Sequence, residues 1–483
     1  MITKFQNIIP SFKTRWTIEG GYAEVLHIAF PLILSTSALS LQHFIDRLFL
    51  TWHSPEAVAA AMPAGILNLA LISIFVGTAS YVGTFVAQYT GAGNDRMIGI
   101  SVWQGIYISL FGGLFYLIFI PLAGPIFSAV HHAPLVQNYE TIYFKVLTLG
   151  AFPSIASAAL TGFYAGQGKT WPVLWINLVA TIVNIVGDYL LIFGKFGFPA
   201  MGIQGAGIAT DLSLLTSMIL FIVLIFRSER NRRQYALKNW KFDRKLFGRL
   251  IRFGLPSGVQ FFIDMAGFTV FLFIMGRLGT TQLAATNVAF NINNLAFMPM
   301  MGLGATVSIL VGQYLGKDQP TLAERSVYSC FHLTFIYMFS ISVAYFFFPE
   351  FFMIPFDSKV NPEQFRPVRE IAVVLLKFVA VYSIFDTLNI IFASAIKGAG
   401  DTRFVMIMLV FLSFGLMVIP TYIVVVILKL NVYAAWACAS LYVITLGLIF
   451  YARFLNGKWK SMRVIETAIP VIMPSMPDLP TPD

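Results

Sequence analysis

The chain has 483 residues, of which 58% are hydrophobic and only 11% are charged, and its mean hydropathy is +0.77. Soluble proteins carry about 25% charged residues, so this composition excludes a soluble globular protein and indicates an integral membrane protein. The net charge of +10 does not indicate a nucleic-acid partner, because ten Lys and Arg residues gather in one segment, residues 227–252. The two cysteines, Cys330 and Cys438, are too few for a disulfide framework and are expected to be packing residues.

Twelve apolar stretches follow one another along the chain, each long enough to cross a bilayer as a helix of about 20 residues. They are expected at residues 25–51, 57–89, 99–129, 141–165, 171–194, 205–227, 249–277, 282–315, 327–355, 370–396, 404–429 and 431–455. The stretches lack the two-residue alternation of transmembrane strands. The predicted fold class is therefore an all-α integral membrane protein with twelve transmembrane helices.

The basic segment divides these helices into two groups of six. By the positive-inside rule this segment is cytoplasmic, and an even number of spans then places both termini on the same side. The Pro-rich end of the chain is expected to be disordered. The expected organisation is a cytoplasmic tail (1–24), an N-terminal six-helix lobe (25–227), a basic linker (228–248), a C-terminal six-helix lobe (249–456) and a second cytoplasmic tail (457–483).

The two halves are related by an internal repeat. Residues 31–91 align without a gap on residues 256–316, at an offset of 225, so that Gln88 meets Gln313. Later the offset is 232, where GQGKT (166–170) meets GAGDT (398–402). Six spans per half in the same orientation form a parallel repeat, as in secondary transporters whose lobes rock around a central cavity.

The GQGKT segment is not a phosphate-binding loop. A P-loop has its first Gly five residues before the Gly that precedes Lys, and it follows a parallel strand, whereas Phe163 holds that position here and the preceding run is long and apolar. We interpret it instead as one of two related turns, each ending a helix with a glycine that can adopt the left-handed conformation.

Five aspartates fall inside predicted spans. Each costs about 2.5–3.5 kcal/mol near the centre of a membrane helix, so such residues are usually functional. The five are Asp46, Asp188, Asp211, Asp264 and Asp386. Asp211 lies nearer a span end and is expected to be structural.

Helical spacing places polar side chains on the same faces as these acids. The stripes are Ser35, Gln42 and Asp46 with His43 beside them; Asn177, Thr181, Asn184 and Asp188; Ser257, Gln260 and Asp264; Asn287, Asn291 and Asn294; and Tyr382, Asp386 and Asn389. Two interpretations compete. The acids alternately bind and release a cation or proton, or they only hold the bundle together by interhelical hydrogen bonds. Arg47 can pair with Asp46 and complicates the first interpretation.

The repeat, the size and several motifs resemble the MATE (multidrug and toxic compound extrusion) family, in particular its bacterial NorM-like branch, from about residue 20 to 455. The motifs are FPLILSTSALSLQHFIDRLFL, NIVGDYLLIFG, GLPSGVQFFID, VGQYLG, YSIFD and KGAGDTR. The resemblance implies the MATE fold and export of cationic amphipathic organic compounds in exchange for inward Na⁺ or H⁺. It also implies a monomer in the bacterial inner membrane, with membrane lipid around it, no nucleic-acid partner, no enzymatic activity and no cofactor beyond the coupling ion.

The resemblance also assigns residues. A cation or proton site in the first lobe falls on Asp46, Asn184 and Asp188, which are the only residues expected to hold Na⁺, and the nearest match to a further threonine is Thr210. The corresponding residues of the second lobe are Asp264, Tyr382 and Asp386. The substrate cavity is expected to include Gln42, His43, Asn177, Gln260, Asn287 and Asn291.

Three alternatives remain at this stage. A lipid-linked saccharide flippase of the same superfamily shares the fold, but is expected to have extra spans and a basic cavity. An intramembrane aspartyl protease is suggested by the Gly-x-Gly-Asp of GAGD, yet no Tyr-Asp pair precedes Asp401. A purely structural membrane protein does not need acids with polar neighbours in both lobes, and ranks last.

Overall fold

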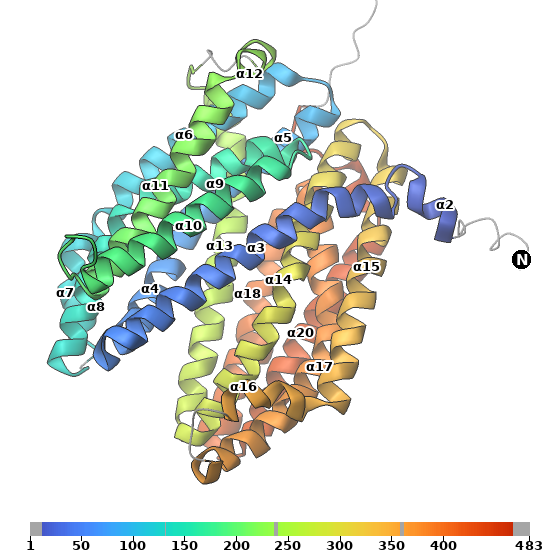
Figure 1. Ribbon diagram of the computed structural model, residues 1–483. Coiled ribbons are helices and arrows are strands. Elements are labelled where there is room, and N and C mark those ends of the chain that lie inside the picture. The colour runs from blue at the N-terminus through green and yellow to red at the C-terminus, as the bar shows by residue number, and fades with distance from the viewer. Residues whose placement is uncertain (1–11, 131, 236–239, 358–361, 467–483) are drawn as a thin grey trace, which may run out of the picture.

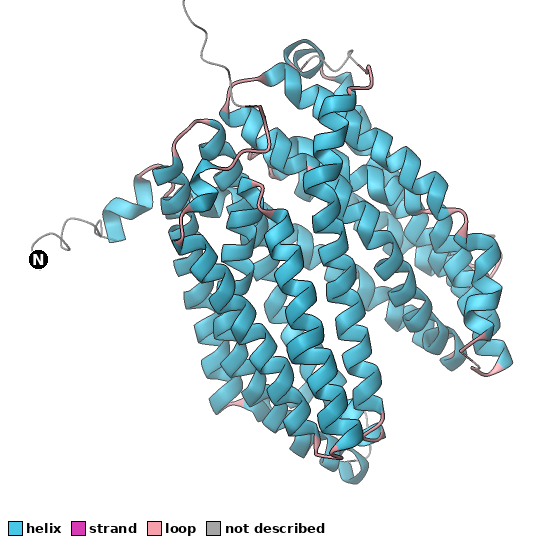
Figure 2. Cartoon of the chain, turned by 180° about the vertical axis from the view of Figure 1, so that it is seen from behind, coloured by secondary structure: helices cyan, strands magenta, loops and turns pink. Residues whose placement is uncertain are grey.

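The computed structural model describes residues 12–130, 132–235, 240–357 and 362–466, and every regular element within these ranges is a helix (Figures 1 and 2). Eleven of the described helices are long and apolar enough to cross a membrane. A twelfth span is formed by α8 and α9 together, which are bent by 45° at their junction. The expected all-α architecture is confirmed. The C-terminal tail 457–483 is expected to be disordered, but its described part, residues 457–466, contains a helical turn (Lys458–Ser461) and buries Trp459 and Val464. Residues 467–483 lie outside the described residues.

The first half contains six spans in chain order. They are α3 (Tyr22–His53); α4 (Pro55–Ser80) continued by α5 (Val82–Gly91); α6 (Asp95–Tyr116) followed by the short α7 (Phe119–Ser128); α8 (Pro134–Leu149) with α9 (Ala151–Gly166); α10 (Trp171–Phe193); and α11 (Ile203–Arg227). A short helix, α2 (Phe12–Thr17), precedes them.

The second half follows the short α12 (Glu229–Gln234) and also contains six spans. They are α13 (Arg244–Gly276), α14 (Thr280–Gly316), α15 (Pro320–Phe347), α17 (Pro362–Ala399), a span from α18 (Thr402–Leu412) through two π-helical turns and α19 (Ile419–Tyr422), and α20 (Val432–Leu455). The short α16 (Ile354–Asp357) lies between α15 and α17.

Local sequence explains where several helices begin. The Ser54 hydroxyl accepts a hydrogen bond from Ala57 N over 3.0 Å, and Pro55 occupies the first helical position of α4. Asp243 caps α13 in the same way, and its carboxylate accepts from Lys245 N and Leu246 N over 3.0 Å each. Such caps satisfy amide groups that the first turn of a helix leaves free.

The two related turns have the expected geometry. Gly168, in GQGKT after α9, has φ 76°, and Gly400, in GAGDT after α17, has φ 116°. Only glycine adopts such angles without steric cost, so each turn stops one span and directs the chain into the next.

The two halves lie side by side and approach each other most closely at one end of the bundle (Figure 1). That end carries α12 and the turns after α5, α9, α14 and α17. We call it the basic end because the described parts of the basic segment, residues 227–235 and 240–252, lie there. Towards the other end α4 and α8 of the first half diverge from α13 and α17 of the second (Figure 1). The two halves therefore form a V (Figure 1).

Glycines allow close contact between the halves. A Cβ on Gly77 of α4 would lie 2.7 Å from Gly258 Cα of α13, and one on Gly302 of α14 would lie 2.7 Å from Ile33 Cγ1 of α3. Gly302 and Gly258 are the repeat equivalents of Gly77 and Ile33, since 302 − 77 and 258 − 33 are both 225. The interface is thus made twice, by equivalent helix pairs.

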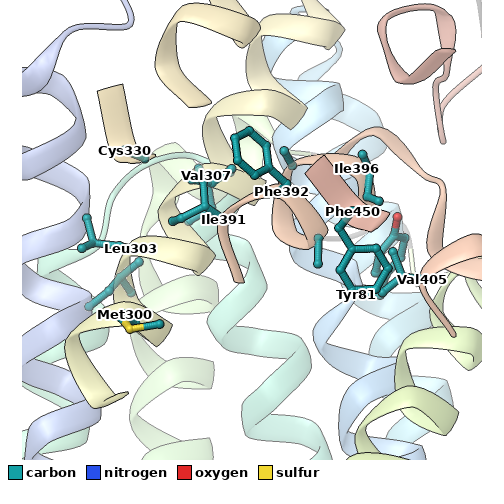
Figure 3. Close-up of a cluster of buried hydrophobic side chains, with 14 of the residues drawn as sticks. Tyr81, Met300, Leu303, Val307, Cys330, Ile391, Phe392, Ile396, Val405 and Phe450 are labelled. Carbon is teal, nitrogen blue, oxygen red and sulfur yellow. The ribbon is translucent and has the colours of Figure 1, made fainter. Parts of the chain in front are cut away.

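A continuous apolar core runs through both halves, and Figure 3 shows a part of it drawn mainly from the second half. Its buried side chains include Met300, Leu303, Val307, Cys330, Ile391, Phe392, Ile396, Val405 and Phe450. Tyr81 of the first half joins this core, and its hydroxyl donates to Lys397 O over 2.7 Å. Cys330 is fully buried, as expected for a packing residue.

Candidate functional site

Helices α3 and α10 pack against each other and carry the polar stripes of the first half. Asn177 Nδ2 donates to Ser35 Oγ over 2.5 Å. Thr181 Oγ1, one turn further along α10, donates to Gln42 Oε1 over 3.5 Å. The two stripes predicted from helical spacing therefore face each other across one helix pair.

The acidic residues of these stripes also meet. Asp46 is 9% exposed and Asp188 is fully buried. When both carboxyl groups are ionised, neither Asp188 oxygen has a hydrogen-bond donor. When either Asp46 or Asp188 carries a proton, the two side chains form a hydrogen bond with each other. Two neighbouring carboxylates repel each other strongly where water is excluded. The pair therefore suits a proton or a cation held between its members.

Asn184 adds an amide to this pair. It lies one turn before Asp188 on α10 and is fully buried, yet neither its nitrogen nor its oxygen has a hydrogen-bond partner within the described residues. An unpartnered buried amide costs about 1–3 kcal/mol, so a ligand that satisfies it is expected. Its oxygen and the two carboxylates are hard ligands, of the kind that alkali and alkaline-earth cations prefer.

Tyr143 of α8 completes this cluster, and the sequence analysis missed it. The residue is 9% exposed, and its phenol lies close enough to Asp46 and Asp188 to interact with their charges. No polar periodicity on α8 marks this tyrosine, so only the packing of α8 against α4 and α11 brings it to the acids.

Thr210 and Asp211 of α11 have local partners. The Thr210 hydroxyl donates to Ala206 O of its own helix over 3.1 Å, and no hydrogen bond joins it to the acid pair in the described part of the chain. Its membership of the site stays a prediction. Asp211 lies against the bend between α8 and α9, where a Cβ on Gly150 would lie 1.9 Å from its carboxylate oxygen.

Two basic side chains flank the acid pair. His43 Nδ1 lies 3.9 Å from Asp46 Oδ2, and the His43 side chain is 69% exposed. Arg47 is exposed, and its charge acts on Asp46. Asp46 is therefore reached by two basic side chains from the exposed side of α3 and by an acid from the buried side.

The second half brings acids from α13 and α17 near each other. Asp386 is 9% exposed and accepts a hydrogen bond from Asn389 Nδ2 over 2.9 Å. Asp264 is half-buried, is hydrogen-bonded to Gln260 and interacts with the charge of Asp386. The Tyr442 phenol of α20 lies near both acids. In contrast to Asp188, each of these acids has a neutral amide partner.

The asparagines of α14 are arranged differently from the predicted stripe. Asn293 donates to the Tyr382 hydroxyl over 3.3 Å and so joins the α17 site. Asn291 is exposed on α14 and Asn287 is half-buried, and neither makes a hydrogen bond to the acids in the ranges described. Their place in a substrate cavity stays a prediction. Asn293 lies one residue off the stripe, so the spacing that selected its neighbours passed over it.

Lys397 is a second residue that the sequence analysis missed. It is half-buried near the basic end of α17, and its charge acts on Asp264. It follows Asp386 by 11 residues, which is three helical turns, and therefore shares the face of that acid. This spacing could have identified Lys397 from the sequence.

Asp401, which suggested an aspartyl protease, has a different partner. Its carboxylate lies 2.7 Å from Arg453 Nη2 and accepts from Arg453 Nε over 2.8 Å. This two-point ion pair with an arginine occupies the carboxylate, whereas protease chemistry needs a second aspartate to share a proton. The geometry of Asp401 is that of a structural ion pair.

Comparison with known proteins identifies the family. The MatE family model matches residues 31–190 and 256–423, which together are well over half of the chain. The chain belongs to the MatE family. The two matched segments begin 225 residues apart, at the offset of the internal repeat.

Relatives of this MatE protein extend over most of its length. A probable multidrug resistance protein NorM of Thermotoga maritima is 24% identical over 468 residues, covering 95% of this chain and 97% of that protein. The multidrug resistance protein PmpM of Pseudomonas aeruginosa is 27% identical over 411 residues, covering 83% of each chain. The NorM-like resemblance is confirmed.

Solved structures agree with the fold. A structure described as the outward-facing conformation of a multidrug resistance MATE family transporter has a TM-score of 0.83 and 17% identity, over 91% of this chain and 96% of that one. A MATE structure described as the bent conformation has a TM-score of 0.81 and 16% identity, over 93% and 98%. The MATE fold is confirmed.

Proposed function

We propose that this MatE protein is a secondary active antiporter that exports cationic, amphipathic organic compounds in exchange for inward Na⁺ or H⁺. The observation that carries the proposal is the buried pair Asp46 and Asp188 beside the unpartnered Asn184. Unpaired acids at this depth are costly unless an ion or proton satisfies them, and a carrier that alternately loads and empties such a site couples its conformation to an ion gradient.

The position of α3 links this site to the second half. Besides packing on α10, α3 contacts α14, where Thr36 Oγ1 donates to Met298 O over 3.3 Å. Loading the acid pair removes the repulsion between α3 and α10, so it changes the packing of a helix that both halves share. We propose that this is how ion binding biases the relative position of the halves.

The acids of the second half are proposed to bind the organic cation. Asp264 and Asp386 have amide neighbours in Gln260 and Asn389. A positively charged substrate beside Asp264 would replace Lys397 as the charge partner of that acid. Gln42, His43, Asn177, Asn287 and Asn291 are proposed to complete the polar lining.

The proposed setting is the bacterial inner membrane, with both termini and the basic end in the cytoplasm. The ten Lys and Arg residues of the segment 227–252 support this orientation through the positive-inside rule. The relatives named multidrug resistance proteins support the substrate class. We propose that the protein acts as a monomer surrounded by lipid, without a nucleic-acid partner, an enzymatic activity or a cofactor besides the coupling ion.

The test is efflux of a fluorescent organic cation from proteoliposomes, with Na⁺ and H⁺ gradients imposed separately. Wild type is compared with Asp46→Asn, Asp386→Asn and, as a control, Glu370→Gln, an exposed acid of α17 paired with Arg366. We expect one gradient to drive efflux, Asp46→Asn to abolish the dependence on that gradient, and Glu370→Gln to behave as wild type.

The other outcomes decide between alternatives. Loss of gradient dependence only in Asp386→Asn would place coupling in the second half. If neither gradient drives any organic cation although the variants fold normally, the antiporter proposal is wrong, and transfer of a labelled lipid-linked saccharide across the vesicle becomes the assay to perform.

A further inference from the structure

Two glutamines related by the internal repeat cross between the halves at the basic end. Gln88 Nε2 of α5 donates to Gly398 O of the second half over 3.0 Å, and Gln313 Nε2 of α14 donates to Gly166 O of the first half over 2.8 Å. The donors are 225 residues apart and the acceptors 232, the two offsets of the repeat. Each half thus holds the glycine turn of the other by an equivalent bond.

The backbone around these bonds allows no space for larger residues. A Cβ on Gly91 would lie 1.9 Å from Gln313 O, and one on Gly316 would lie 2.1 Å from Gln88 O. Gly91 and Gly316 are again repeat equivalents. We call the four residues Gln88, Gln313, Gly91 and Gly316 the glutamine latch. They form a contact surface between the halves.

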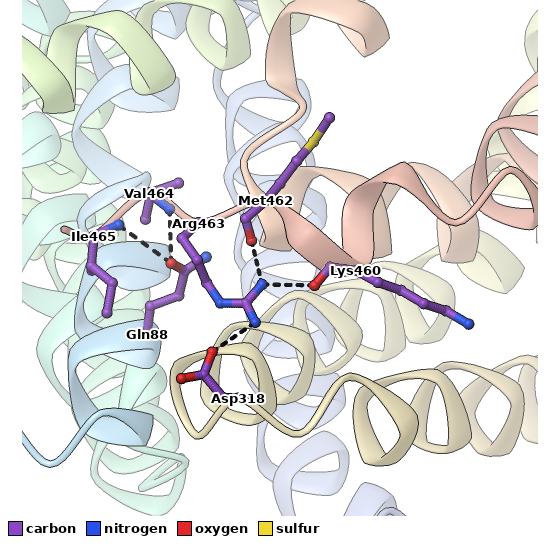
Figure 4. A network of polar contacts seen from close by, with 7 residues as sticks. All are labelled: Gln88, Asp318, Lys460, Met462, Arg463, Val464 and Ile465. Carbon is purple, nitrogen blue, oxygen red and sulfur yellow. Dashed lines mark hydrogen bonds and ion pairs between the residues drawn. The ribbon is translucent and has the colours of Figure 1, made fainter. Parts of the chain in front are cut away.

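The C-terminal segment 458–466 breaks the symmetry of the glutamine latch (Figure 4). Gln88 Oε1 accepts from Val464 N over 2.8 Å and from Ile465 N over 3.4 Å. Val464 is buried against the glycine turn of the second half, where a Cβ on Gly400 would lie 2.9 Å from Val464 Cγ1. The Gln88 amide is therefore bonded through both its nitrogen and its oxygen, to two different segments.

Ion pairs attach the same segment to the second half of the bundle, whereas Gln88 attaches it to the first. Arg463 Nη2 lies 3.0 Å from Asp318 Oδ1, just beyond α14 (Figure 4). Lys460 Nζ lies 2.7 Å from Glu324 Oε2 of α15. On the other side, Arg249 of α13 donates to Val464 O. The segment 458–466 therefore runs from α15 across the junction to α5 and α13.

We propose that the segment 458–466 is a strap that locks the basic end closed, and that Gln88 is the residue through which it holds the glutamine latch. The proposal rests on the proposed alternating-access function. In that function the basic end opens, and opening must break the contacts of the strap as well as both glutamine bonds. The strap is proposed to set the ratio of closed to open forms, and this ratio can be measured without any substrate.

The experiment measures the distance between spin labels at Arg96 and Arg403, which are exposed in the first turns of α6 and α18 at the basic end. The labels are placed in full-length protein in which Cys330 and Cys438 are replaced by alanine. Three changes are compared with the unmodified chain: a stop after Gly457, a stop after Glu466 and Gln88→Glu. The glutamate keeps an acceptor for Val464 N but loses the donor to Gly398 O.

We expect the stop after Gly457 to raise the ratio of long to short label distances about three- to tenfold, as loss of a few buried or charged hydrogen bonds does. The stop after Glu466 should leave the distribution unchanged. Gln88→Glu should give an intermediate increase, because the strap remains while one latch bond is lost.

Gln313→Ala is compared with Gln88→Glu, because Gln313 is the repeat equivalent of Gln88. It removes the other latch bond and leaves the strap untouched, since Gln313 is not bonded to segment 458–466 in the described structure. If the two truncations give the same distribution, the strap proposal is overturned. A transport assay in the same liposomes separates the two ideas, since a changed distance distribution without organic-cation efflux supports the strap and contradicts the antiporter proposal.

Discussion

Charge repulsion between Asp46 and Asp188 is the residue-scale feature with the clearest energetic consequence. With both acids ionised, neither Asp188 oxygen has a hydrogen-bond donor, and both atoms of the Asn184 amide are also unpartnered. Buried polar groups of this kind reduce stability, and binding sites commonly retain them because the ligand needs them. Stability and function should therefore respond in opposite directions to changes at this cluster.

Asp188→Asn is expected to raise the thermal unfolding midpoint by about 1–3 °C, because it removes one of two facing carboxylates. Asn184→Asp, which adds a third acid at the neighbouring turn, is expected to lower it. The measurement is thermal unfolding in detergent at low Na⁺ and neutral pH. Equal midpoints in the two variants would show that the acids are screened from each other.

Tyr143 provides a second prediction at this scale. Tyr143→Phe keeps the packed ring but removes the phenol hydroxyl that interacts with the charges of the acid pair. The ion concentration needed for half-maximal efflux should therefore change about three- to tenfold while expression stays normal. Tyr139→Phe is the control, because Tyr139 lies one turn earlier on α8 and is half-buried. A change in maximal rate alone would assign the hydroxyl a role in the movement of the halves instead.

At the scale of helices, glycine determines how closely the two halves approach. The contact between α4 and α13 has Gly258 at its centre, where a Cβ would lie 2.1 Å from Ile74 O. Alanine at this position forces the helices apart, since a backbone carbonyl cannot move as a flexible side chain can. The same helix contains Gly248, where a Cβ would meet nothing within 4 Å.

Gly258→Ala is therefore expected to destabilise the protein by about 1–3 kcal/mol through overpacking. Gly248→Ala should be neutral or stabilising by up to about 1 kcal/mol, because alanine favours helix. Denaturant or thermal unfolding of both variants under identical conditions checks the difference. If Gly258→Ala is as stable as wild type, α4 and α13 must be able to move apart at this contact without loss of stability.

At the scale of the whole molecule, the proposed orientation can be tested with single cysteines. In a chain without Cys330 and Cys438, Arg403→Cys at the basic end should react with a membrane-impermeant thiol reagent only from the cytoplasmic side. Phe348→Cys, at the opposite end and 66% exposed in wild type, should react only from outside. Reaction of Arg403→Cys from outside would reverse the topology deduced from the basic segment.

The sequence alone predicted the number of helices, their order and the division into two halves, because burial in hydrocarbon imposes long apolar runs that are visible one residue at a time. It also located the acids of both sites, since a charge in an apolar run stands out without any knowledge of its neighbours. The internal repeat was equally visible, and the two glycine turns had the backbone that their composition indicated.

Tertiary structure decided which of these faces meet. Helical spacing selects a face but not the helix opposite it, so Asn293 rather than Asn287 or Asn291 bonds to Tyr382, and Tyr143 reaches the acids from a helix without a polar stripe. The bonds from Gln88 to Gly398 and Val464 join segments more than 300 residues apart in sequence. Contacts of this kind depend on how twelve rigid helices pack against one another, which no local pattern in the chain specifies.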